Sequence, residues 1–88
     1  MTGALRQRGD LAQRKVEHEL LLLDTELAKI HQLNETATFV WERWSQVADA
    51  REMAKLLAQK YDVSEDTAVS DVAAILARLQ ELGLLVGE

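Results

Sequence analysis

The chain has 88 residues, which suffice for one domain with a modest core but not for a large substrate cavity. Hydrophobic residues (48%) and charged residues (28%) occur in the proportions of a soluble globular protein. The absence of cysteine excludes disulfides, thiolate zinc sites and cysteine nucleophiles, and it fits a cytoplasmic location. No apolar run approaches the roughly 18 residues of a membrane span, and the amino terminus lacks the apolar stretch of a secretory signal. The net charge of −5 disfavours nucleic acid, because binding to phosphates needs clustered Lys and Arg.

The first third of the chain favours short strands. Residues 1–10 contain two glycines and no hydrophobic periodicity, so we expect a flexible arm before a single domain over residues 11–88. Three segments are typical of strands: residues 11–17, 20–23 and 28–33. Asp24, Thr25 and Glu26 favour a turn before the third segment, and an antiparallel meander is the economical arrangement. Helix is the competing interpretation for residues 17–29, because Leu, Glu and Ala favour it.

Three helices follow, each opened by a capping residue. Asn34, Asp49 and Ser64 carry side-chain oxygens that accept hydrogen bonds from a first helical turn, and Gly83 favours the left-handed conformation that ends the last helix. The apolar stripes of the three helices are Ala37, Val40, Trp41, Trp44 and Val47; Met53, Leu56 and Leu57; and Val69, Val72, Ala73, Leu76, Leu79 and Leu82. The apolar residues 84–86 are expected to fold back on the core. The sequence therefore predicts an α+β domain, a three-stranded antiparallel sheet followed by three helices, similar in outline to a winged helix-turn-helix.

No constellation of residues indicates catalysis. His18 and His31 lack the further ligands that a metal site needs, and the four glycines lie at the two ends of the chain, where they form no phosphate loop. No serine has a neighbouring histidine that would act as its base. We therefore expect no catalytic residue, no metal and no cofactor. Trp41 and Trp44 are most simply core residues, with a ligand-facing Trp44 as the alternative.

The third predicted strand offers a possible binding edge. An outer strand of a meander leaves a row of N–H and C=O groups unpaired, and an extended peptide can add to it as a further strand. Lys29 and His31 would blunt such an edge under the alternative interpretation, in which the edge binds nothing. Binding also requires a neighbouring apolar groove. The last helix can supply one, because Ile75 and Leu82 widen its apolar arc toward one flank, next to Asp71 and Arg78.

The sequence also resembles a known family. The blocks LNETATFVW (residues 33–41), YDV (residues 61–63) and DVAAILARLQELGLL (residues 71–85) are similar to the coenzyme PQQ synthesis protein D family, the recognition elements of ribosomally synthesised, modified peptides. The similarity covers residues 16–86. One departure is that residues 44–49 replace the Asp-Gly turn that is common in the family, so we expect a longer first helix.

The resemblance implies a function and a site. It implies that the domain binds the leader segment of a precursor peptide as a strand added to its third strand, against its third helix. The domain would then present the precursor to a modifying enzyme, often a radical S-adenosylmethionine protein. The peptide-binding residues implied for this chain are Lys29, Ile30, His31, Gln32 and Leu33 of the strand and Asp71, Ile75, Arg78 and Leu82 of the helix. The resemblance does not identify PQQ as the product.

Two alternatives of other classes remain at this stage. A winged-helix transcriptional regulator would read DNA with the last helix, where Arg78 is the only base-reading cation among several carboxylates. A structural homodimer would use the same edge and groove on a second copy, for example by exchanging strands.

Overall fold

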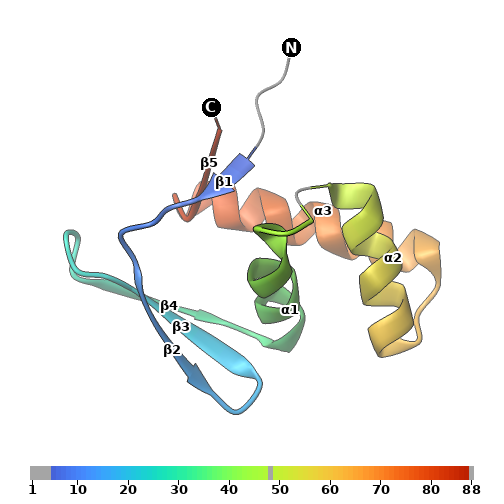
Figure 1. The fold of residues 1–88 in the computed structure, drawn as a ribbon, viewed down its shortest axis with the longest axis horizontal. Coiled ribbons are helices and arrows are strands. Elements are labelled where there is room, and N and C mark those ends of the chain that lie inside the picture. Colours follow the sequence, from blue (N-terminus) through green and yellow to red (C-terminus); the bar gives the residue numbers. More distant parts are fainter. Residues whose placement is uncertain (1–4, 48, 88) are drawn as a thin grey trace.

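A computed structural model describes residues 5–47 and 49–87. The elements in chain order are β1 (Leu5–Gln7), β2 (Ala12–Val16), β3 (Glu19–Asp24), β4 (Lys29–Leu33), α1 (Glu35–Trp44), α2 (Ala50–Tyr61), α3 (Glu65–Glu81) and β5 (Leu85–Gly87). Strands β2, β3 and β4 form one antiparallel sheet in that order, and the three helices lie together to one side of it (Figure 1). The predicted α+β fold, with three strands followed by three helices, is confirmed.

The amino-terminal segment differs from the predicted loose arm. Residues 1–4 of that arm lie outside the described residues, but β1 pairs antiparallel with β5, with Arg6 opposite Val86 (Figure 1). A three-residue strand is too short to show the alternation by which strands are predicted, and its partner lies at the other end of the chain. The expected return of residues 84–86 to the core is confirmed, because Leu84 and Leu85 are almost completely buried.

The predicted capping residues begin the helices. The side chains of Asn34, Asp49 and Ser64 each accept a hydrogen bond from a main-chain N–H in the first turn of the helix that follows. Gly83, which follows the C-cap residue Leu82 of α3, has φ +73°, the conformation that favours glycine there. Helix α1 ends at Trp44, before the last position of its predicted apolar stripe, Val47.

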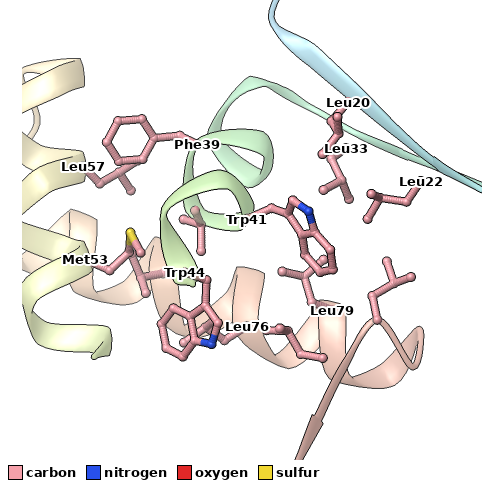
Figure 2. Close-up of a cluster of buried hydrophobic side chains, with 14 of the residues drawn as sticks. Leu20, Leu22, Leu33, Phe39, Trp41, Trp44, Met53, Leu57, Leu76 and Leu79 are labelled. Atoms are coloured by element: carbon pink, nitrogen blue, oxygen red, sulfur yellow. The ribbon is translucent and has the colours of Figure 1, made fainter. Parts of the chain in front are cut away.

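The core is one cluster between the sheet and the helices, and both tryptophans belong to it. The ring of Trp41, which is 1% exposed, lies between the sheet leucines and Leu79 of α3 (Figure 2). Trp44 is 4% exposed, and its indole N–H donates to the main-chain oxygen of Leu5 at 3.0 Å. The core interpretation of Trp41 and Trp44 therefore holds, because both side chains are buried.

Helix α3 is rotated relative to its predicted stripe. Val69 is 52% exposed and Ala73 is also exposed, whereas Ala68 is completely buried. The buried stripe runs Ala68, Val72, Leu76 and Leu79. Helices α2 and α3 pack against each other, and a small alanine allows a closer approach than a valine does. This rotation leaves Ile75 and Leu82 partly exposed on one flank of α3.

Candidate functional site

Strand β4 is an outer strand of the sheet. Its residues pair with β3 from Lys29 opposite Asp24 to Leu33 opposite Leu20. Over residues 5–47 and 49–87, no other strand pairs with the opposite edge of β4. The predicted open edge is therefore present in the described part of the chain.

The hydroxyl of Thr38 shows which main-chain groups of β4 face the open edge. This buried hydroxyl accepts from the N–H of Leu20 at 3.1 Å and donates to the C=O of Leu33 at 3.2 Å. One oxygen atom can reach both groups only if they point toward each other, so Leu20 and Leu33 form a pair of the hydrogen-bonded type. Such pairs alternate along an antiparallel ladder. The main-chain groups of His31 therefore also point to β3, and those of Ile30 and Gln32 point outward.

The sheet has a second open edge at β2, with different surroundings. All five residues of β2 are exposed. By the same alternation, the main-chain groups of Gln13 and Lys15 point away from β3. The Lys15 ammonium, 2.9 Å from Glu42 of α1, is a charge of the kind that blunts an edge strand.

An apolar groove lies between β4 and α3. It encloses about 430 Å³ and is lined by Ile30, His31, Gln32, Leu33, Asn34, Ala37, Ala74, Ile75, Arg78, Leu79 and Leu82. The walls thus bring together seven of the nine residues implied by the family resemblance. Ala37, Ala74 and Leu79 are additional apolar members. Asn34 and Ala37 could have been expected from their position at the start of α1, which follows β4.

Two of the implied residues lie beyond the groove. Lys29 is the first residue of β4, next to Ile30, and its side chain is exposed. Asp71 lies one helical turn before Ile75 on α3 and is also exposed. Both positions flank the walls of the groove without lining it.

The groove carries positive charge in an acidic protein. Arg78 is its only permanently charged lining residue, and the lining contains no carboxylate. The Arg78 side chain is 67% exposed, and its guanidinium lies 3.8 Å from Glu81, so this surface pair holds it only weakly. A carboxylate on a bound ligand could replace Glu81 without the cost of breaking a strong ion pair.

A smaller hollow of about 140 Å³ lies beside β2, α1 and α2, and its polar groups are largely paired within the protein. The Tyr61 hydroxyl donates to Glu35 at 3.1 Å. The pKa of Tyr61 is raised, mainly by burial and to a smaller extent by this hydrogen bond. The Arg43 guanidinium lies 3.8 Å from the centre of the Phe39 ring.

The described residues contain no group of three or more His, Cys, Asp or Glu side chains arranged to hold a metal ion. Within the same residues, none of the helices combines the length and apolar character that a membrane crossing requires.

An open strand beside an apolar groove is the geometry of domains that take up an extended segment by strand addition. The family model of coenzyme PQQ synthesis protein D (PqqD) matches residues 19–85, and the chain belongs to this family. A comparison with curated proteins finds no match.

Two solved structures share the fold. A lasso peptide synthetase B1 complexed with its leader peptide is 26% identical, with a TM-score of 0.83 over 94% of this chain and 98% of that chain. TbiB1 in complex with the TbiA(beta) leader peptide is 18% identical, with a TM-score of 0.83 over 94% of this chain and 96% of that chain.

Proposed function

We propose that the protein is a non-catalytic, cytoplasmic peptide-binding domain that recognises the leader segment of a ribosomally synthesised precursor. The leader would add as a strand to the open edge of β4 and cover the groove next to α3. The observation that carries the proposal is the coincidence of outward-facing main-chain groups at Ile30 and Gln32 with an apolar groove at the same strand. Family membership and the leader peptides named for the two structural neighbours support it.

Main-chain pairing supplies affinity that is independent of sequence. Ile30 and Gln32 together offer two N–H donors and two C=O acceptors to an added strand. Each net hydrogen bond contributes about 0.5–1.5 kcal/mol. In an added strand, every second side chain would point toward the groove.

The groove would supply selectivity. An apolar leader side chain buried against Ile75, Leu79 and Leu82 would contribute about 1.5–3 kcal/mol. Arg78 would favour a leader carboxylate near this apolar side chain. Lys29 and Asp71 would meet leader residues just outside the groove. The favoured ligand is therefore an extended segment with alternating apolar residues and a nearby acidic residue.

The bound leader would bring its precursor to a modifying enzyme. A radical S-adenosylmethionine protein is the partner proposed from the family resemblance, and a synthetase of another kind is the alternative that the name of one structural neighbour suggests. Copurification of the domain with each candidate enzyme, with and without leader, would distinguish them. The DNA-reading alternative has little support, because α3 carries Arg78 beside Glu65, Asp66, Asp71 and Glu81.

The decisive experiment compares two proline substitutions. A displayed library of precursor leader segments, selected against the protein, supplies the best-binding sequence, which we call the probe peptide. Gln32→Pro removes an outward N–H from β4, and Gln13→Pro removes an outward N–H from β2; both residues are exposed. We expect Gln32→Pro to weaken binding of the probe peptide at least about tenfold in calorimetry, since it removes a hydrogen bond and blocks the approach of the added strand.

Gln13→Pro is the matched control, because Gln13 lies on the β2 edge and not on β4. It should leave the affinity within about twofold, whereas a loss of about 1.4 kcal/mol would correspond to a tenfold change. Gln32→Ala controls for the hydrogen bond of 2.6 Å from the Gln32 side chain to Glu19. Unchanged affinity in a folded Gln32→Pro variant, or an equal loss in both proline variants, would refute strand addition at β4.

A further inference from the structure

Arg8 connects two distant parts of the fold. Its main-chain N–H donates to the C=O of Leu84 at 3.1 Å, and its guanidinium donates to Asp24 at 2.8 Å. The same guanidinium also contacts Asp10 through two bonds, at 2.6 and 3.1 Å. Arg8 therefore has one anchor in the main chain and another in its side chain.

These anchors lie near the two walls of the groove, although neither Leu84 nor Asp24 lines it. Leu84 follows Leu82, a groove residue at the end of α3, with only Gly83 between them. Asp24 is the last residue of β3 and lies opposite Lys29, the first residue of β4. Arg8 thus spans from the carboxyl end of α3 to the end of β3, the strand that pairs with β4.

Asp24 is a buried carboxylate that accepts hydrogen bonds from two different segments. It is 2% exposed, and its second carboxylate oxygen accepts from the N–H of Leu27 at 3.1 Å, within the turn that leads into β4. A buried carboxylate that loses its cation is strongly unfavourable. Hydrogen bonding to Arg8 accordingly lowers the pKa of Asp24.

The hairpin that Arg8 holds extends away from the helices. The β3–β4 turn projects to the left in Figure 1, beyond the helical layer. Leu27 and Ile30 near this turn are 62% and 67% exposed. The core therefore provides little restraint at this end of β4, whereas Leu33 at the other end is buried.

We propose that Arg8 is a positioning residue that sets the width of the groove between β4 and α3, and hence its affinity for a leader segment. This inference rests on the proposed function. It concerns a segment outside residues 19–85, to which the family model extends. The segment around β1 thereby contributes to binding without lining the groove.

The test compares Arg8→Ala with Asp10→Ala. Asp10→Ala removes only the exposed partner of Arg8 and leaves the bonds to Asp24 and Leu84 available. We expect Arg8→Ala to weaken binding of the probe peptide about tenfold or more, and Asp10→Ala to change it less than about twofold. Ala54→Gly, a substitution at a buried site in α2 away from the groove, controls for a general loss of stability.

A distance measurement separates positioning from stability. The chain has no cysteine, so spin labels on cysteines introduced at Lys29 and Glu81 report the separation of the two walls without interference. We expect Arg8→Ala to broaden this distance distribution, and the probe peptide to narrow it again. Asp10→Ala and Ala54→Gly should leave the distribution as in the unsubstituted protein.

The outcomes are distinct. If the selection yields no leader segment that binds the unsubstituted protein, the proposed function fails. If it binds and a folded Arg8→Ala variant shows the same affinity and distance distribution, the role of Arg8 is refuted while the proposed function stands. Should Arg8→Ala not fold, Arg8→Lys is judged instead. Lysine keeps the charge but not the forked geometry, so about a two- to fivefold loss of affinity with a broader distribution is expected, and no change in either would overturn the inference.

Discussion

Thr38 shows how one residue determines the geometry of the candidate site. Its buried hydroxyl satisfies the N–H of Leu20 and the C=O of Leu33 at the point where β4 passes into α1. This bridge holds β4 against β3 in the register that directs Ile30 and Gln32 outward. Nothing in the sequence block around Thr38 distinguishes it from an ordinary helix residue, so sequence analysis did not predict its role.

Thr38→Val should therefore destabilise the fold. The substitution preserves side-chain shape but removes a buried hydroxyl and its two hydrogen bonds to the main chain, which costs about 1–3 kcal/mol in the free energy of unfolding. Urea unfolding monitored by tryptophan fluorescence measures this. Thr36→Val is the control, because the Thr36 hydroxyl contacts only Asn34 at an exposed position. Similar losses in both variants would show that the bridge has no special weight.

The elements themselves were largely predictable. The capping residues Asn34, Asp49 and Ser64 define helix starts by local chemistry, and the alternation of residues 28–33 identified the edge strand. The rotation of α3 and the pairing of β1 with β5 were not predictable in the same way. Both depend on contacts between segments that are distant in the sequence, which local periodicity does not record.

From the orientation of α3 we predict different effects of the same substitution on two sides of this helix. Ile75 lines the groove, whereas Val69 is exposed on the same helix outside it. Ile75→Asp should weaken binding of the probe peptide at least about tenfold, because it places a charge where an apolar side chain would be buried. Val69→Asp introduces the same charge into the same helix and should change affinity less than about twofold. Isothermal calorimetry measures the affinity of both variants for the probe peptide. Equal losses of affinity in the two variants would contradict the assignment of Ile75 to the groove wall.

At the scale of the whole molecule, β1 pairs with β5 near the other end of the chain, and Arg8, the residue after β1, pairs with Asp24 of the three-stranded sheet. Arg8 forms ion pairs with Asp24 and Asp10, and hydrogen bonding to its guanidinium holds the pKa of both carboxyls below the ordinary value. Each group is therefore protonated more readily in the unfolded chain than in the folded protein. Their contribution to stability is complete above the unfolded pKa of about 4 and is lost as the pH falls through the lower folded-state values.

The free energy of unfolding should accordingly decrease below about pH 4. Urea unfolding at a series of pH values measures this dependence. Asp24→Asn should lower stability at pH 7 and flatten the decrease at low pH, because a titrating group has been removed. An unchanged acid profile in Asp24→Asn would contradict the assigned role of the ion pair.

The account depends on one physical claim, that β4 binds a leader segment through the main-chain groups of Ile30 and Gln32. Residue-resolved amide exchange by NMR, with and without the probe peptide, tests it most directly. Binding should slow exchange at Ile30 and Gln32 about tenfold or more, while Gln13 and Lys15 on the β2 edge keep their rates. Unchanged exchange at Ile30 and Gln32 in the saturated complex, or protection at Gln13 and Lys15 instead, would contradict it.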